Sequence, residues 1–186
     1  MHKLLPGGKA KKLIDTSISL FTDNGFHNIG VDTIIRESKV SKTTLYKYFE
    51  SKEKMIEVSL HVNKELLKEQ VELIVNQTTY LKVTEKLKKI YYLHADLDSP
   101  YHLLLRAILE IKGTYPIAFE LVVRYRTWLV NTVHELITQS RPSADFQDAY
   151  MFLFIVDGAL TQLLSSKQVD DRERLFDYLM NKVCTK

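Results

Sequence analysis

The chain has 186 residues, of which 45% are hydrophobic, and it contains only six glycines and four prolines. This composition supports one or two packed cores and argues against an all-β fold, which needs turn residues every ~8–12 positions. The net charge of +3 lies entirely in residues 1–60, which hold ten Lys/Arg against seven Asp/Glu, whereas the remainder holds sixteen of each.

Apolar residues recur with a helical period along the first 76 residues, interrupted by turn and capping signals. Asn24-Gly25 ends the first pattern, with Gly25 at a position that tolerates positive φ. Ser41 and Ser51 are N-cap candidates for the third and fourth helices. The sequence therefore predicts helices over 9–23, 31–38, 42–49 and 52–76.

Beyond residue 76 the pattern stays helical, and no stretch alternates long enough with the period of two that a strand requires. Proline and glycine mark the main breaks, at 98–100, 113–116 and 141–142. We therefore expect an all-α chain of about nine helices, the last five lying near 79–95, 100–112, 116–140, 145–166 and 171–184.

The second and third predicted helices are short and joined by about three residues, which is the pattern of a helix-turn-helix. In that motif the second helix enters the DNA major groove with its N-terminus first, so small polar residues there can approach base edges. Lys42, Thr43 and Thr44 meet this requirement, and the basic excess of residues 1–60 favours the same partner. A short amphipathic helix of an ordinary bundle would also begin with a serine cap, so the pattern alone leaves both interpretations open.

Residues 12–58 resemble the DNA-binding domain of the TetR family of transcriptional regulators. Four pieces carry the resemblance: LF…NGF at 20–26, V..I at 31–34, VSK.TLY.YF at 40–49 and SKE at 51–53. The resemblance implies an all-α fold with a helix-turn-helix domain over 1–52. A long fourth helix would join this domain to a helical ligand-binding and dimerisation domain over 53–186.

The resemblance also implies roles for individual residues. The positions that match major-groove contacts are Lys42, Thr43 and Tyr46. The positions that match phosphate contacts are Lys47, Tyr48, Lys52 and the helix start near Val31 and Thr33; Ser41 and Thr44 complete the expected DNA-binding set.

Two positions depart from the family pattern. Lys39 stands where the turn usually has glycine, so we expect a lysine with positive φ there. Gly30 stands where a capping Thr or Ser is common, which removes one possible phosphate ligand. Neither departure breaks the motif, and Lys39 could add a phosphate contact of its own.

Residues 103–165 loosely resemble the C-terminal domain of one TetR subgroup, most clearly in FIVDGAL at 154–160. The family resemblance implies a homodimer that binds a palindromic operator in double-stranded DNA and releases it when a small-molecule effector binds. The candidate effector contacts, which ordinary packing or surface ion pairs would also explain, are His61, Tyr91, His94, His102, Arg106, Tyr125 and Trp128. The candidate dimer contacts are Phe152, Ile155, Gly158, Ala159, Leu175, Tyr178 and Leu179.

The sequence contains no Gly-rich phosphate loop, no GxSxG motif and no metal-binding histidine spacing, so we expect no enzyme, cofactor or metal site. The lone cysteine, Cys184, allows no intrachain disulfide, and no signal peptide or confident membrane span is visible, so we expect a cytoplasmic protein. The main hypothesis is a TetR-like repressor. Two alternatives stay open: a constitutive dimeric DNA-binding protein without an inducer, and a helical protein-interaction module.

Overall fold

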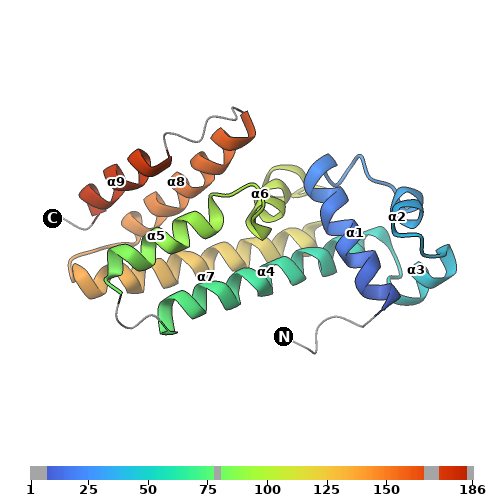
Figure 1. The fold of residues 1–186 in the computed structure, drawn as a ribbon, viewed down its shortest axis with the longest axis horizontal. Coiled ribbons are helices and arrows are strands. Elements are labelled where there is room, and N and C mark those ends of the chain that lie inside the picture. Colours follow the sequence, from blue (N-terminus) through green and yellow to red (C-terminus); the bar gives the residue numbers. More distant parts are fainter. Residues whose placement is uncertain (1–7, 78–80, 166–171, 184–186) are drawn as a thin grey trace. The chain divides into compact units, whose positions relative to one another are not determined.

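A computed structural model describes residues 8–77, 81–165 and 172–183 of the chain. Across these residues the chain forms nine α-helices and no strand, which confirms the predicted fold class (Figure 1). The helices are α1 (Lys9–Asn24), α2 (Val31–Ser38), α3 (Lys42–Tyr48), α4 (Lys52–Gln77), α5 (Val83–His94), α6 (Pro100–Glu110), α7 (Pro116–Ser140), α8 (Phe146–Ser165) and α9 (Arg172–Val183).

The chain divides into two compact units, each with its own contacts. Unit 1 consists of Met1–Glu65 with Leu103–Val123, and unit 2 consists of Leu66–His102 with Arg124–Lys186. Unit 1 therefore contains all of α1, α2 and α3, together with parts of α4, α6 and α7. No helix in the described part of the chain is long and apolar enough to cross a membrane.

In unit 1, α1, α2 and α3 pack against one another around a core of large apolar side chains. The turns between them follow from the residues that the sequence offers. Gly25 ends α1 with a φ of 82°, and its N–H donates to the carbonyl of Phe21. Lys39 ends α2 in the left-handed region with a φ of 54°, as its place in the turn predicts.

The expected serine caps are present at the next two helix starts. The hydroxyl oxygen of Ser41 accepts the N–H of Thr44 at 3.3 Å, and that of Ser51 accepts the N–H of Lys54 at 3.1 Å. Each serine satisfies a backbone donor that the first turn of a helix would otherwise leave unpaired. These caps fix the starts of α3 and α4, so that α3 is a short, separate helix.

In unit 2, α5, α8 and α9 pack against one another. The start of α5 lies later than the predicted residue 79, because the carboxylate of Glu85 accepts the N–H of Lys82 at 2.8 Å and caps a helix that begins at Val83. Lys86 is nearly buried, and its ammonium donates to the carbonyl of Val75 at 2.8 Å. This bond ties α5 to the last turn of α4, where carbonyls lack helical partners.

Candidate nucleic-acid interface

The third helix presents one face to the core and the opposite face to solvent. Leu45 is fully buried and Phe49 nearly so, which fixes the rotation of α3 about its axis. Thr43, Tyr46 and Lys47 are consequently exposed. A helix anchored by its apolar side with small and basic residues on its outer side is the arrangement that a major groove accepts.

Two aromatic side chains on this surface are only partly covered by protein. Tyr46 is 44% exposed and Tyr48 is 43% exposed, although both rings are large enough to stabilise a core. Tyrosine combines an apolar ring with a hydroxyl, so it can contact a sugar or base through one part and a phosphate through the other. Their exposure is consistent with the DNA contacts that the sequence predicts.

The side chains of α3 differ in how strongly protein partners hold them. The Lys42 ammonium lies 3.5 Å from a carboxylate oxygen of Asp32, and both groups are well exposed, so this ion pair is weak. Thr44 and Ser41 instead share a hydroxyl–hydroxyl bond of 2.8 Å within the cap. Lys42 is thus available to a base edge, whereas Ser41 and Thr44 also stabilise the start of the helix.

The starts of α2 and α4 flank α3 along the chain. Val31 and Thr33 are half-buried in the first turn of α2. Lys52, the first residue of α4, is half-buried, and burial lowers the pKa of its ammonium below the usual value of 10.5. A phosphate near Lys52 would favour the charged form, because an opposite charge counteracts the effect of burial.

The helices α1, α2 and α3, together with the first turns of α4, coincide with a known family pattern. The model for bacterial regulatory proteins of the tetR family matches residues 13–58. This match covers about a quarter of the chain and concerns the DNA-binding region of the family. The resemblance of residues 12–58 to the DNA-binding domain of TetR regulators is therefore confirmed.

Part of the chain is also similar to a curated bacterial protein. A stretch of 48 residues is 40% identical to YuxN, an uncharacterized HTH-type transcriptional regulator of Bacillus subtilis; it covers 26% of this chain and 16% of that protein. The chain thus spans only a small part of this curated relative.

Solved structures show that the TetR fold extends over nearly the whole chain. A TetR transcriptional regulator from Legionella pneumophila has a TM-score of 0.83 at 12% identity, covering 98% of this chain and all of that one (100%). SCO4454, a TetR-family regulator from Streptomyces coelicolor, has a TM-score of 0.79 at 22% identity, covering 96% and 87% of the two chains. At these identities the likeness concerns the fold.

The predicted effector contacts do not form one cluster. His61 lies on α4 in unit 1, 3.9 Å from Glu65, and Arg106 forms an ion pair with Glu110 in the same unit. The other five lie in unit 2, where they have different partners. Tyr91 is buried, and its hydroxyl donates to the carbonyl of Arg172. His102 contacts the carbonyl of Leu97, and Trp128 is half-buried with the ammonium of Lys68 5.4 Å from its ring.

Two of the predicted residues, His94 and Tyr125, do meet inside unit 2. His94 Nδ1 lies 2.7 Å from the carbonyl of Ile90, which can only accept, so Nδ1 carries the proton. Tyr125 then donates its hydroxyl to Nε2 at 2.6 Å. Burial lowers the pKa of His94 to about 4 and raises that of Tyr125, so both groups are neutral near pH 7.

Beside His94 lies an ion-pair network that sequence reasoning missed. The guanidinium of Arg126 donates to both carboxylate oxygens of Asp157, at 2.9 and 2.6 Å, and also to the hydroxyl of Tyr101. Tyr101 in turn donates to Asp157 at 2.7 Å, and burial raises its pKa. A single charge within the apolar run AYMFLFIVDGAL was the signal for Asp157, but its partner Arg126 lies on another helix.

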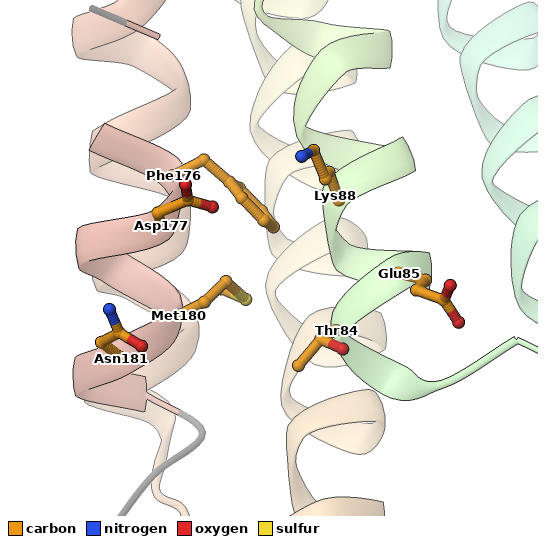
Figure 2. A pocket seen from close by; sticks show the side chains of 7 residues that line it. All are labelled: Thr84, Glu85, Lys88, Phe176, Asp177, Met180 and Asn181. Atoms are coloured by element: carbon orange, nitrogen blue, oxygen red, sulfur yellow. The ribbon is translucent and has the colours of Figure 1, made fainter. Parts of the chain in front are cut away.

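A groove of about 360 Å³ runs along α5 and α9 in unit 2 (Figure 2). Its lining residues are Thr84, Glu85, Lys88, Phe176, Asp177, Met180 and Asn181. Phe176 and Met180 are mostly buried, while the polar side chains stand at its edges. None of the predicted effector contacts lines this groove.

The predicted dimer contacts on α8 and α9 lie on different faces. Phe152, Ala159 and Leu179 are buried in the core of their own chain. Gly158, Leu175 and Tyr178 are exposed, and Ile155 is half-buried. Large apolar residues that were not predicted are exposed beside them, namely Tyr150, Met151, Phe154 and Leu164.

Within the described residues no group of three or more His, Cys, Asp or Glu side chains could hold a metal ion. Cys184 lies outside the described residues.

Proposed function

We propose that the protein is a homodimeric repressor that binds a palindromic operator and releases it when a small molecule binds. The observation that carries this proposal is the outer face of α3, where Thr43, Tyr46 and Lys47 are exposed while Leu45 is buried. The match of residues 13–58 to the tetR family model supports the same conclusion.

The DNA-binding residues have two roles in this proposal. Lys42 and Thr43 lie at the start of α3 and Tyr46 lies one turn after Lys42, and these three residues read base edges in the major groove. Lys47, Tyr48 and Lys52 bind phosphates, as do the first-turn residues Val31 and Thr33 of α2, and these contacts set the position of α3 in the groove.

Dimerisation would place two copies of α3 on successive half-sites about one helical turn (~34 Å) apart. An exposed apolar ridge on α8 supports this arrangement, because Tyr150, Phe154 and Gly158 are spaced by four residues and therefore share one helix face. Phe154 is 61% exposed, and a Cβ at Gly158 would meet no heavy atom within 4 Å. We propose that a second copy covers this ridge.

A substitution of Phe154→Glu tests the ridge directly. We expect it to shift the protein from dimer to monomer in analytical ultracentrifugation, because a carboxylate would be buried without a partner. Ile117→Glu is a matched control, since Ile117 is 62% exposed on α7. Equal behaviour of the two variants would contradict dimerisation through α8.

Effector release would require two conformations of the dimer that differ in the separation of the two α3 helices. An effector that binds the non-matching conformation more tightly shifts the population away from DNA, and DNA opposes effector binding by the same factor. The family supports this proposal, and titration of DNA-bound protein with candidate effectors tests it. An effector that saturates the protein and leaves DNA affinity unchanged would contradict it.

Binding to the DNA immediately upstream of the protein's own coding region is the first experiment. We expect tight, salt-dependent binding that exceeds binding to an unrelated duplex of equal length, because phosphate contacts release counterions. Lys47→Ala should weaken binding to both duplexes, whereas Lys42→Ala should alter sequence preference, by about 1–3 kcal/mol for a good base contact. Weak and equal binding to every duplex tried, including one selected from a random pool, would contradict DNA binding.

A further inference from the structure

We propose that Glu110 is a positioning residue for DNA binding, because it fixes the loop that leads into α2. Glu110 is the last residue of α6, and it lies outside residues 13–58, to which the family model extends. Its partners belong to unit 1, as it does. This inference rests on the proposed phosphate contacts at the start of α2.

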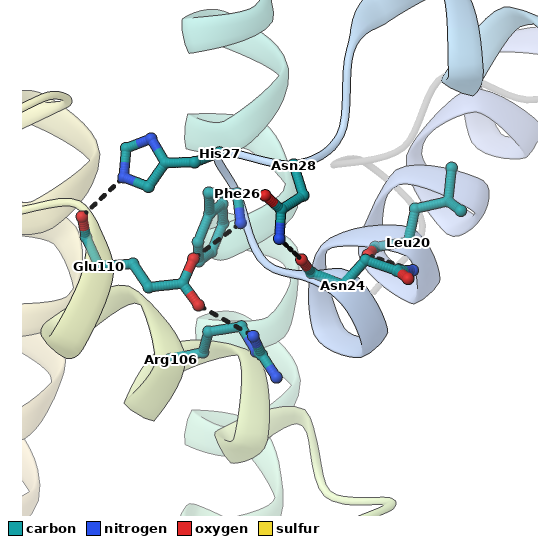
Figure 3. A network of polar contacts seen from close by, with 7 residues as sticks. All are labelled: Leu20, Asn24, Phe26, His27, Asn28, Arg106 and Glu110. Atoms are coloured by element: carbon teal, nitrogen blue, oxygen red, sulfur yellow. Dashed lines mark hydrogen bonds and ion pairs between the residues drawn. The ribbon is translucent and has the colours of Figure 1, made fainter.

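Three interactions join Glu110 to the loop after α1 and to α6 (Figure 3). One carboxylate oxygen, Oε2, accepts the backbone N–H of Phe26 at 2.8 Å. The other, Oε1, accepts from the guanidinium of Arg106 at 2.9 Å. The backbone carbonyl of Glu110 accepts from Nε2 of His27 at 2.9 Å.

These contacts orient Glu110 as well as the loop. Glu110 and Arg106 are four residues apart on α6, and each side chain is 25% exposed, so their ion pair is partly shielded from water. The pair holds the carboxylate in place for Phe26. The His27 ring stacks on Tyr115 with its centroid 6.2 Å away, which adds a contact beyond the end of α6.

The loop is built to receive the carboxylate. Gly25 has a φ of 82° and a ψ of 164°, a conformation that is essentially restricted to glycine. A Cβ at this position would lie 2.8 Å from Oε2 of Glu110 and 3.2 Å from Nη1 of Arg106. Gly25 therefore serves two purposes, because it ends α1 and leaves room for the ion pair.

Fixing Phe26 fixes the path of the chain into α2. The Phe26 side chain is fully buried and stacks on Phe21, with ring centroids 5.3 Å apart, while its N–H is held by Glu110. The amide of Asn28 donates to the carbonyl of Asn24 at 2.9 Å and shapes the next turn. α2 begins at Val31, so any shift of Phe26 moves the N–H groups that would hold a phosphate.

Hydrogen bonds to phosphate weaken steeply with distance and angle, so a displacement of about 1 Å is enough to lose one. If Glu110 contributed only to the stability of the fold, its loss would have a different measurable effect. Loss of Glu110 would then lower the unfolding midpoint, but each folded molecule would bind DNA as the wild type does.

The test compares Glu110→Ala and Glu110→Gln with Leu109→Ala. Leu109 is the neighbouring residue on α6 and is 74% exposed, so it controls for changes to the helix itself. Glu110→Gln retains an acceptor for the Phe26 N–H but loses the ion pair with Arg106, and it remains informative if the alanine variant does not fold. The probe is a labelled duplex that the wild-type protein selects from a random-sequence pool.

We expect Glu110→Ala to raise the dissociation constant about tenfold, which corresponds to the loss of a hydrogen bond to a phosphate. Glu110→Gln should lie between it and the wild type, and Leu109→Ala should match the wild type. In a double-mutant cycle Thr33→Val should weaken binding in the wild type but not in Glu110→Ala, because the contact that Thr33 makes is already lost.

Two results would overturn the inference. In the first, Glu110→Ala and Glu110→Gln leave the dissociation constant as in Leu109→Ala. In the second, Thr33→Val lowers affinity in full in both backgrounds. If the wild-type protein selects no duplex, the proposed function fails and this inference fails with it. If the wild type binds and the Glu110 variants match the control, this inference alone fails.

Discussion

Two tyrosines of α3 and three tyrosines in the core of unit 2 are used in opposite ways. Tyr46 and Tyr48 of α3 are 44% and 43% exposed. In unit 2 the hydroxyls of Tyr91, Tyr101 and Tyr125 are bonded to other groups of the chain, and these side chains are at most 2% exposed. The same residue type therefore faces outward on α3 and stabilises the core at these three positions of unit 2, whereas Tyr150 and Tyr178 of unit 2 are exposed.

The difference separates the expected effects of mutation. A polar group at the surface can form its hydrogen bonds with water, and it gives these up only when a partner binds. A buried polar group must form its hydrogen bonds with other groups of the chain. Changes to exposed residues of unit 1 should alter DNA affinity and leave stability near the wild-type value. Changes to the buried network of unit 2 should alter stability first.

The largest effect is expected for Asp157→Ala. This change leaves the guanidinium of Arg126 mostly buried without its carboxylate, which should lower the free energy of unfolding by about 3–5 kcal/mol. Urea unfolding followed by circular dichroism measures the change. Glu173→Ala is the matched control, because its ion pair with Lys88 is exposed, and we expect no measurable loss. Equal losses of unfolding free energy in both variants would contradict the expected difference between the buried and the exposed ion pair.

Stability should also depend on pH through His94. Burial lowers its pKa to about 4 in the folded state, from 6.5 in the unfolded chain, so between these values the unfolded chain binds more protons. Stability is therefore unaffected by this group above the unfolded pKa and falls as pH decreases toward the folded pKa.

From about pH 7 to about pH 5 the loss attributable to His94 should be about 2 kcal/mol. Urea unfolding at the two pH values measures it. His94→Gln should reduce this dependence, whereas His27→Gln should retain it because His27 is exposed. The prediction is wrong if both variants keep the wild-type difference between the two pH values.

A direct comparison of tyrosines comes next in size. Tyr125→Phe removes the donor to His94 Nε2 and leaves a buried acceptor unpaired, which should cost about 1–2 kcal/mol of stability. Tyr48→Phe should leave the unfolding midpoint unchanged and weaken DNA binding several-fold, by about 1 kcal/mol for one hydrogen bond. Stability and binding are measured on both variants, and a stability loss in Tyr48→Phe would break the comparison.

The smallest effect is expected at Lys39, whose φ of 54° is unfavourable for a residue with a Cβ. Lys39→Gly should stabilise unit 1 by less than about 1 kcal/mol, because relief of strain is partly offset by the greater freedom of glycine in the unfolded chain. Lys39→Ala keeps the strain and loses the charge. If the charge contributes to DNA binding, both variants should bind more weakly than the wild type. If Lys39→Ala binds as the wild type does, the charge makes no contribution.

Unit 1 could be predicted closely because its signals are local. The bounds of α2, the caps at Ser41 and Ser51 and the positive φ of Lys39 each depend on residues within one or two turns of each other. The capping and turn preferences of serine and glycine act over that range. The exposed positions of α3 follow from the same local pattern.

The polar contacts of unit 2 were not predictable in this way. Arg126 and Asp157 are 31 residues apart on different helices, and helical spacing cannot pair them. The effector contacts were predicted as polar or aromatic residues on otherwise apolar helices. This criterion selected the buried residues Tyr125 and His94, but it also selected Trp128, which is half-exposed, so it did not distinguish burial. On α8, apolar residues occur on more than one face, so periodicity did not separate the core side from the exposed ridge.

Trp128 has a practical consequence for spectroscopy. It is the sole tryptophan of the chain and belongs to unit 2, where Lys68 lies over its ring. Intrinsic tryptophan emission therefore follows the unfolding of unit 2, while far-ultraviolet circular dichroism follows the helices of both units. Coincident transitions by the two probes would mean that the units unfold together, and a separation would give each unit a transition of its own.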